Sequence, residues 1–359
     1  MKIGILTYHR AENFGAVIQS YALSTYLRNA GHEVELIDFR CGNVEMQYDI
    51  WNPRILWSRK NVACSLKDYL SRFFCLRARR IRKKKFADFR RLLPMSERFC
   101  AKDLLKDYDA VIVGSDQVWN FHINRHSENV FLLDLKIPKD VWKIAYAASA
   151  EREGLQRIDQ AYLAKCLQDF RRISVRETAL KEELKLLSPQ KIEVCVDPVF
   201  LLDKEVYERL CAPCSPCRPY VLVYHMTYSS RLTEIAGREA ANKNMQLVEL
   251  YGGFNRKDTS STVTSWGPRE LLAYIANAET VYTTSFHGLA MSLIMEKNVW
   301  VYDTGSNSRQ KNILSMAGLE CRLLGSKDDY CEHTIDFKAV KARLMPFIDR
   351  SKNFLNFQQ

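Results

Sequence analysis

The chain has no stretch that suits a membrane span or a secretory signal. Nothing in it approaches the about 20 consecutive apolar residues that a transmembrane helix needs. Its apolar start, Lys2–Tyr8, is too short for a signal peptide and is interrupted at once by His9 and Arg10. We therefore expect a protein that is made and kept in the cytoplasm.

The cysteines do not form a disulfide framework. There are 11 of them, an odd number at irregular spacing in a large chain, which favours reduced and mostly buried thiols. Cys211, Cys214 and Cys217 form a CxxCxxC run in a proline-rich connector without an adjacent fourth ligand. We predict no metal and no cofactor, although the run leaves a zinc or iron–sulfur site as the alternative.

Several other signatures are missing. The sequence contains no GxGxxG motif, P-loop, internal repeat or low-complexity tract, so no nucleotide is assigned from it. It shows no nucleic-acid-binding module and no interleaved aromatic platform, and we expect no nucleic-acid partner. Its 359 residues, 47% of them hydrophobic, are enough for two full-sized cores, so we expect two domains and no disorder.

Positive charge is concentrated in one segment. Nine Lys or Arg residues stand against one acid, Asp88, between Arg77 and Arg91, in a chain of net charge +11. Apolar residues recur through 60–93 at helical spacing, which predicts an amphipathic helix or helix pair. Its basic face suits an anionic membrane surface or an acidic substrate; the alternative is an ordinary solvated face.

The first part of the chain alternates between strand and helix patterns. Such alternation predicts a doubly wound α/β domain over residues 1–210, with the basic segment 60–93 included. The expected strands are 2–7, 33–39, 108–113, 143–149, 172–176 and 191–196, and the expected helices include 16–30 and 158–169.

The composition turns polar and rich in proline between Leu202 and Pro219, where we place the domain junction. A second α/β domain is predicted over 218–345, followed by a tail at 346–359. We expect its strands at 220–225, 246–251, 281–283 and 299–302, and its helices at 230–243, 268–277, 288–296 and 310–317. This pattern predicts two Rossmann-like sheets that face each other across a cleft.

Polar residues gather after two strands of the first domain. Ligands bind at the carboxyl ends of parallel strands, so these loops are candidate sites. Amide, carboxylate and aromatic groups together suit a sugar, and we predict an acceptor site there. Asp116 is a candidate base, with a helix N-cap as the alternative. The acceptor-binding candidates are Asn13, Gln19, Ser115, Trp119 and Asn120.

Arg176 ends the strand 172–176. A guanidinium group at that place suits bidentate binding of a carboxylate. The alternative is an ion pair with Glu177 or Asp197.

The stretch from Val281 to Tyr302 predicts a strand, a helix and a second strand. His287 lies where the first strand meets the helix, and Thr284 and Ser285 add hydroxyl groups. A helix start favours anions, and histidine changes its charge near neutral pH, so this place suits proton transfer beside a phosphate or carboxylate. The alternative is an ordinary cap at Ser285 with a satisfied histidine. Arg309 opens a later helix in the same manner.

Six motifs together resemble the polysaccharide pyruvyl transferase family. They are LTYHRAENFGAVIQSYAL, VIVGSDQVWN, ISVRE, VDPVFLL, TTSFHG and NSR followed by a helix, in this order. The resemblance covers essentially the whole chain, from Lys2 to about Leu323. The resemblance implies a fold similar to the B-type glycosyltransferases. It also implies transfer of the enolpyruvyl unit of phosphoenolpyruvate to two hydroxyls of a sugar, which leaves a pyruvate ketal and free phosphate.

The resemblance assigns roles to two residues. His287 matches the family's active-site histidine, and Arg176 matches an arginine associated with donor binding. Many members resemble Arg-Leu-His where this chain has Ser285-Phe286-His287. We add Arg309 on physical grounds as a second cation, with Thr284 and Ser285 as further donor-binding groups. We expect the imidazole to meet guanidinium groups from both halves of the chain in one crevice.

The expected acceptor is a sugar carried on a lipid such as polyprenyl diphosphate, or on a nucleotide. The basic segment would then place the enzyme peripherally at the inner face of the membrane. One alternative is a glycosyltransferase of similar fold that uses a nucleotide sugar. Another is a non-catalytic binding protein of the same fold.

Overall fold

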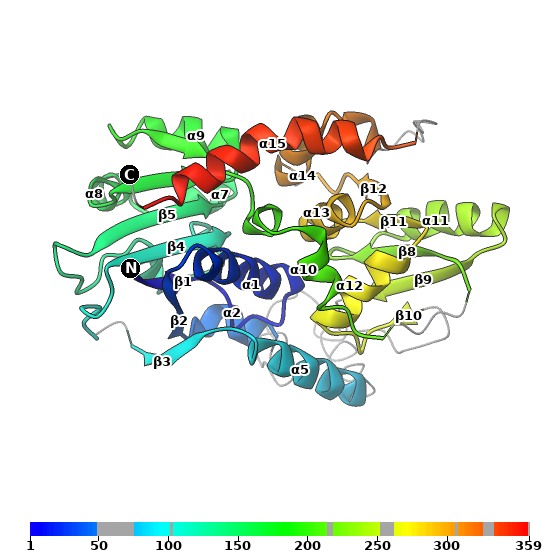
Figure 1. The fold of residues 1–359 in the computed structure, drawn as a ribbon, viewed down its shortest axis with the longest axis horizontal. Coiled ribbons are helices and arrows are strands. Elements are labelled where there is room, and N and C mark those ends of the chain that lie inside the picture. Colours follow the sequence, from blue (N-terminus) through cyan, green and yellow to red (C-terminus); the bar gives the residue numbers. More distant parts are fainter. Residues whose placement is uncertain are drawn as a thin grey trace, which may run out of the picture. The chain divides into compact units, whose positions relative to one another are not determined.

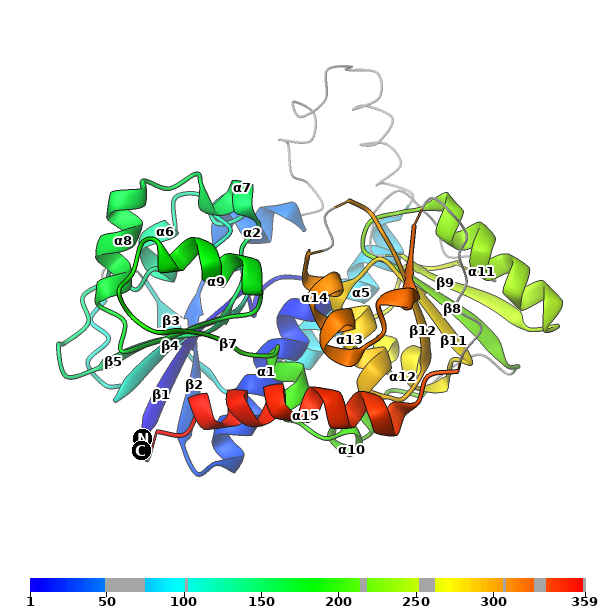
Figure 2. The same cartoon turned by 90° about the horizontal axis from the view of Figure 1, so that it is seen from above.

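The computed structural model describes residues 1–48, 75–100, 103–213, 218–251, 262–305, 308–325 and 334–357. The chain divides into two compact units (Figures 1 and 2). The first comprises Met1–Tyr48, Arg90–Leu202 and Met345–Gln359, and the second comprises Asp49–Phe89 and Asp203–Leu344.

The first unit is built on a parallel sheet. Its described strands lie in the order β3-β2-β1-β4-β5-β6-β7, and every neighbouring pair is parallel. The direction of winding therefore reverses between β1 and β4, which is a topological switch point. The bounds are β1 Lys2–Leu6, β2 Glu33–Phe39, β3 Met95–Phe99, β4 Ala110–Asp116, β5 Trp142–Ala148, β6 Arg172–Val175 and β7 Ile192–Val194.

Helices cover both faces of this sheet, as the crossovers of a parallel sheet require. The longest of those within the unit, α1 at Phe14–Asn29, begins at Asn13, whose side chain accepts a hydrogen bond from the Ala16 N–H. The others are α2 Gly42–Gln47, α6 Glu128–Phe131, α7 Arg152–Leu155, α8 Gln160–Gln168, α9 Thr178–Lys185 and the 3₁₀ turn η1 Pro198–Leu201.

The second unit repeats this plan. Its described strands lie in the order β10-β9-β8-β11-β12-β13, again all parallel, so the winding reverses between β8 and β11. The strands are β8 Tyr220–His225, β9 Gln246–Tyr251, β10 Thr262–Val263, β11 Thr280–Thr283, β12 Asn298–Tyr302 and β13 Leu323–Leu324. The helices are α5 Leu76–Arg90, α10 Lys204–Glu208, α11 Ser230–Asn242, α12 Pro268–Asn277, α13 Phe286–Ile294, α14 Ser308–Ala317 and the turn η2 Glu320–Arg322; α15 Phe337–Phe354 begins here and ends in the first unit.

The predicted fold class, two doubly wound α/β domains, is confirmed by these two sheets. The domain division differs from the predicted one in two places. The described part of the basic segment, predicted to lie in the first domain, belongs to the second unit through Phe89. There Arg82 lies over the Trp266 ring at 4.1 Å, and Lys85 pairs with Glu270 at 2.9 Å.

The prediction that residues 346–359 form a separate tail is also wrong. Its first part continues α15, and Phe354, Leu355 and Phe357 pack into the core of the first unit. The Val196 N–H donates to Ser351 Oγ at 2.9 Å. These residues complete the first unit because their side chains cover the sheet.

None of the helices in the described ranges is long and apolar enough to cross a membrane.

Candidate functional site

The switch point of the first sheet brings together the loops after β1 and β4. Thr7 Oγ1 donates to the Ser115 carbonyl at 3.0 Å, and Tyr8 Oη donates to the Gln117 carbonyl at 3.0 Å. Gln19 Nε2 donates to Thr7 Oγ1 at 2.8 Å. The end of β4, where Asp116 lies, is therefore fixed to the loop after β1, and that loop is fixed to α1.

Asp116 lies at this edge with a partly exposed side chain. Its backbone φ of 78° is in the left-handed region, which is rare for a residue with a side chain and is found preferentially at functional sites. Its Oδ1 accepts a hydrogen bond from the Gln117 N–H at 2.9 Å. The alternative of a helix N-cap is wrong, because the next helix, α6, begins at Glu128.

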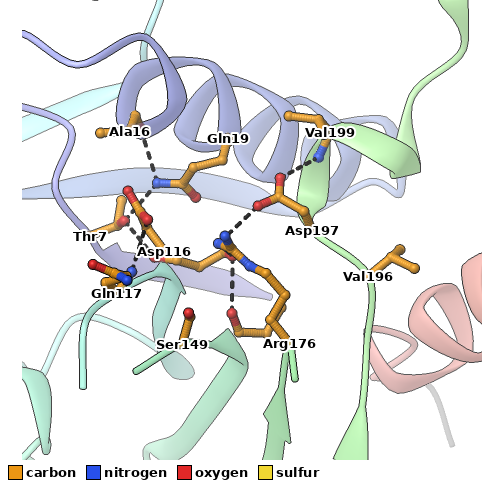
Figure 3. Close-up of polar contacts among 12 residues, drawn as sticks. Thr7, Ala16, Gln19, Asp116, Gln117, Ser149, Arg176, Val196, Asp197 and Val199 are labelled. Atoms are coloured by element: carbon orange, nitrogen blue, oxygen red, sulfur yellow. Dashed lines mark hydrogen bonds and ion pairs between the residues drawn. The ribbon is translucent and has the colours of Figure 1, made fainter. Parts of the chain in front are cut away.

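Arg176 is buried in the same network (Figure 3). It is 3% exposed, and its Nη2 lies 2.8 Å from Asp197 Oδ2. The same Nη2 donates to Ser115 Oγ at 2.6 Å. Of the two roles considered, the ion pair with Asp197 is the one that the structure shows. Glu177 accepts instead from Ser149 Oγ at 2.6 Å.

The acceptor-binding predictions need one correction. Trp119 is 0% exposed; its Nε1 donates to the Phe131 carbonyl at 3.0 Å, and its ring packs against Phe170. A ring enclosed in this way has no face for a sugar, so the stacking role is wrong.

The other acceptor candidates lie around the same edge. Ser115, Gln19 and Asn120 are buried. Asn120 Oδ1 accepts from the His122 N–H at 3.2 Å, a bond that shapes the loop. Asn13 is partly exposed and caps α1. Contact of these four with a sugar stays a prediction.

Next to this loop, His9 and Arg10 hold the carboxylate of Asp38 at the end of β2. Arg10 Nε donates to Asp38 Oδ1 at 2.7 Å, and a second guanidinium nitrogen pairs with Oδ2. His9 Nε2 lies 3.4 Å from Oδ1. The hydrogen bond with His9, together with Arg10, lowers the pKa of Asp38 well below its usual range against the effect of burial.

The switch point of the second sheet joins the loops after β8 and β11. Thr284 Oγ1 accepts from the N–H groups of Met226 at 2.9 Å and Thr227 at 3.1 Å, and donates to the Thr227 carbonyl at 2.9 Å. A hydroxyl has one donor and two acceptor positions, and all three are used here. The donor-binding role predicted for the Thr284 hydroxyl is therefore wrong, and its function is to join the two loops.

Ser285 and His287 stand at the start of α13. Ser285 Oγ accepts from the Gly288 N–H at 3.2 Å, so the predicted cap is present. His287 is in the first turn and is 6% exposed. A Cβ atom on Gly288 would lie 2.5 Å from Thr283 Oγ1 and 2.8 Å from the Tyr224 ring. The helix can start this close to the sheet only because residue 288 is glycine.

The start of α14 reaches the same place. Arg309 is its second residue and is partly exposed. The next residue, Gln310, is buried, and its Nε2 donates to the Thr284 carbonyl at 3.3 Å. Gln310 was not predicted as a site residue. Its position after Arg309 was the only available signal.

A second unpredicted group is formed by residues of β8, β9 and α11. His225 ends β8 and is buried, with its Nε2 3.4 Å from Glu249 Oε2 and 3.1 Å from Thr233 Oγ1. Thr233 donates to Glu249 at 2.7 Å. The signal in the sequence that could have identified His225 is its position at the end of a predicted strand, a position like that of Arg176.

The cysteine run is only partly described. Cys211 Sγ donates to the Tyr207 carbonyl at 3.5 Å, whereas Cys214 and Cys217 lie outside the described residues.

The predicted convergence of His287 with groups of the first unit stays a prediction.

Comparisons with known proteins give one extensive match. A family model described as polysaccharide pyruvyl transferase matches residues 13–306, which include parts of both units. A search of curated proteins returned no match.

Solved structures are similar at low identity. UDP-GlcNAc 2-epimerase from Neisseria meningitidis, bound to UDP-GlcNAc, is 10% identical over 99% of this chain and 93% of its own, with a TM-score of 0.46. The epimerase from Methanocaldococcus jannaschii is 11% identical over 97% and 93%, with a TM-score of 0.47. A Streptomyces sp. glycosyltransferase complexed with thymidine diphosphate is 13% identical over 99% and 94%, with a TM-score of 0.39. Because these TM-scores are below 0.5, the fold assignment stands on the sheet topology.

Proposed function

Because the chain belongs to the polysaccharide pyruvyl transferase family, we propose that it moves the enolpyruvyl group of phosphoenolpyruvate to a sugar and forms a pyruvate ketal. The acceptor in this proposal is a lipid-linked or nucleotide-linked precursor of a polysaccharide. The scheme uses phosphoenolpyruvate as a co-substrate and has no resident cofactor.

The observation that carries the proposal is the placement of His287. It lies in the first turn of α13, at the switch point of the second sheet. The first N–H groups of a helix lack partners within the helix, and the positive end of its dipole favours phosphate. The start of α14, with Arg309, is joined to this place through Gln310 and Thr284. An imidazole thus stands where the fold favours an anion.

The reaction divides into two additions. In the first, a proton is added to the methylene carbon of phosphoenolpyruvate, and a sugar hydroxyl attacks the resulting oxocarbenium-like carbon and loses its proton. In the second, the C–O bond to phosphate breaks, inorganic phosphate leaves, and a second hydroxyl attacks and loses its proton. The two hydroxyls together lose two protons. One of them balances the proton that was added to the methylene carbon, and the other leaves with phosphate.

Three residues have roles in these steps. His287 is the acid that protonates the methylene carbon, since an imidazole can give and take a proton near neutral pH. Arg309 offsets the negative charge on the departing phosphate. Asp116, held in a left-handed backbone conformation at the first sheet's edge, is the base for an acceptor hydroxyl.

The test is incubation of the purified protein with phosphoenolpyruvate and a panel of lipid-linked and nucleotide-linked sugars, with mass spectrometry for added pyruvate. We expect His287→Ala to lower phosphate release with the true acceptor by about 100-fold or more, the usual size of an acid–base contribution. Ser292→Ala is the matched control, because its hydroxyl lies in the same helix and bonds to the Gly288 carbonyl at 2.7 Å.

Full phosphate release by His287→Ala would contradict the assignment. Thermal shifts with phosphoenolpyruvate, compared with UDP and GDP, separate this function from transfer of a nucleotide sugar. Stabilisation by a nucleoside diphosphate alone would favour the glycosyltransferase.

A further inference from the structure

We infer that a cavity at the amino ends of β6 and β7 binds an acidic saccharide, that is, a sugar that carries a carboxylate group. We call it the α15 cavity, because α15 forms one of its walls. All of its lining residues belong to the first unit. The class of ligand does not depend on the proposed function, whereas the pyruvate ketal as the source of the carboxylate rests on it.

The α15 cavity lies at the opposite edge of the sheet from Asp116 and Arg176. Its volume is about 770 Å³, which is within the usual range for small-molecule sites. Arg172 begins β6, which has four residues, and Arg176 follows its end. At about 3.3 Å per residue, the strand separates the two edges by roughly 13 Å. A ligand in this cavity is therefore bound apart from the groups at the carboxyl ends of the strands.

Positive charge dominates this part of the surface. A second cavity, of about 400 Å³, adjoins the first and shares part of its lining. Six cations and two carboxylates line the two cavities together, so the field there favours an anion. The cations are Arg171, Arg172, Lys181, Lys185, Lys191 and Arg350, and the carboxylates are Glu193 and Asp349.

Two of the arginines are held in place by the first unit. Arg172 Nη1 donates to the carbonyls of Phe354 and Asn356, each at 3.0 Å, which fixes the end of α15 to β6. The guanidinium carbon of Arg171 lies 3.8 Å from the centre of the Trp142 ring. A stacked guanidinium group uses its face for the ring and keeps its in-plane N–H groups for a carboxylate. Arg171 is thus a preorganised cation in the cavity wall.

The other lining residues suit a sugar better than a small inorganic anion. Ile173 and Phe354 are buried apolar side chains of the lining, and Gln190 and Asn353 add side-chain amides. Sugar hydroxyls bond to amides and carboxylates, and the C–H surface of a sugar ring packs on apolar groups. An inorganic phosphate would leave most of the 770 Å³ unfilled. A sugar with a carboxylate uses the cations, the amides and the apolar groups at once.

The proposed reaction forms a ligand of this class. A pyruvate ketal keeps the carboxylate of phosphoenolpyruvate on the sugar, so each transfer turns a neutral sugar into an acidic one. Because the cavity lies at the other edge of the sheet, it binds the acidic product and not the acceptor that is reacting.

The test is an NMR titration of the protein with three methyl glycosides. They are the 4,6-pyruvate ketal of methyl glucoside, methyl glucuronide and unmodified methyl glucoside. We expect both acidic glycosides to bind at least about tenfold more tightly than the neutral one, since bonds to charged groups are the stronger ones. We expect their affinity to fall as salt is raised, because the attraction is screened.

The test variant combines Arg171→Gln with Arg350→Gln, and both side chains are exposed. The control combines Arg28→Gln with Arg98→Gln, which removes the same two charges from exposed positions of the first unit outside the two cavities. We expect the Kd of the acidic glycosides to rise about tenfold in the test variant and to stay unchanged in the control. If the test variant does not fold, Arg350→Gln alone decides the question.

Equal binding of acidic and neutral glycosides overturns the proposal, and so does an unchanged Kd in the test variant or no binding of either acidic glycoside. Inorganic phosphate that binds as tightly as the ketal, with the same loss in the test variant, would overturn the assignment to a sugar. Binding of methyl glucuronide without the ketal keeps the acidic sugar and rejects the proposed reaction as its source. A wild-type protein that binds both acidic glycosides but transfers no pyruvate contradicts the proposed function alone.

Discussion

Asp38 illustrates how one carboxylate makes stability depend on pH. Its pKa is lowered in the folded protein by the hydrogen bond with His9 and by Arg10. A lowered folded pKa stabilises the protein at pH values above the unfolded pKa of about 3.9, and this contribution is lost as the pH falls through that value toward the folded pKa.

We therefore expect Asp38→Asn to be less stable than the wild type at pH 7, with a difference that shrinks from about pH 5 downward. Denaturant unfolding at a series of pH values measures this difference. Asp169→Asn is the control, because that carboxylate is 65% exposed and pairs with Lys143 at the surface, where ion pairs contribute little. A difference that stays constant from pH 7 to pH 3 would contradict the explanation.

Single residues were also where sequence interpretation was least complete. The motif around Trp119 indicates a loop at a strand end, but a sequence does not say whether its ring turns outward or into the core. Thr284 likewise stands beside the predicted histidine, yet three hydrogen bonds with the β8 loop occupy its hydroxyl. Both outcomes depend on partners far away in the sequence.

Among the secondary structure elements, α5 has two different faces. One face is buried, and Arg82 and Phe86 on it pack against the Trp266 ring. The buried residues of the helix are Arg79, Arg82, Phe86 and Phe89. The opposite face is exposed and carries basic side chains around the exposed Ile81. This arrangement is that of an amphipathic helix whose basic side suits acidic lipid headgroups.

We expect the protein to float with liposomes that contain acidic lipids and not with neutral ones, and to do so less as salt is raised, because the attraction is screened. Charge reversal at four exposed α5 positions should abolish flotation. The test positions are Arg77, Arg80, Lys83 and Lys84, and the control positions, exposed lysines of the first unit, are Lys106, Lys139, Lys165 and Lys191. If charge reversal on α5 does not change flotation, the basic face of α5 does not bind the membrane and is an ordinary solvated face.

Most elements could be predicted because periodicity and strand-end residues are local signals. Strand 220–225 and helix 268–277 have the predicted bounds, and α13 begins two residues earlier than predicted. The assignment of α5 to the second unit was missed because it involves contacts with Trp266, which is about half the chain away in sequence from Arg82. The short strands β10 and β13 offer too few residues for a pattern.

At the scale of the whole molecule, the chain leaves the first unit after Leu202 and returns to it at Met345. The returning residues complete a core that begins with β1. Phe354 is buried there, with its ring 6.0 Å from that of Tyr146.

We expect Phe354→Ala to lower the free energy of unfolding of the first unit by about 3–5 kcal/mol, as for other buried phenylalanines. Denaturant unfolding monitored by hydrogen exchange measures the loss of stability and shows which unit it affects. Leu186→Ala is the control, since that side chain is 86% exposed. A loss no larger than in the control would contradict the role of the last helix in this core.

The return of the chain also sets an order for biosynthesis. During translation, the residues that complete the first core emerge only after the residues of the second unit. The second unit has most of its sequence available earlier, whereas the nascent first unit keeps apolar side chains uncovered throughout that interval. The unfinished half is therefore the one that chaperones and proteases meet.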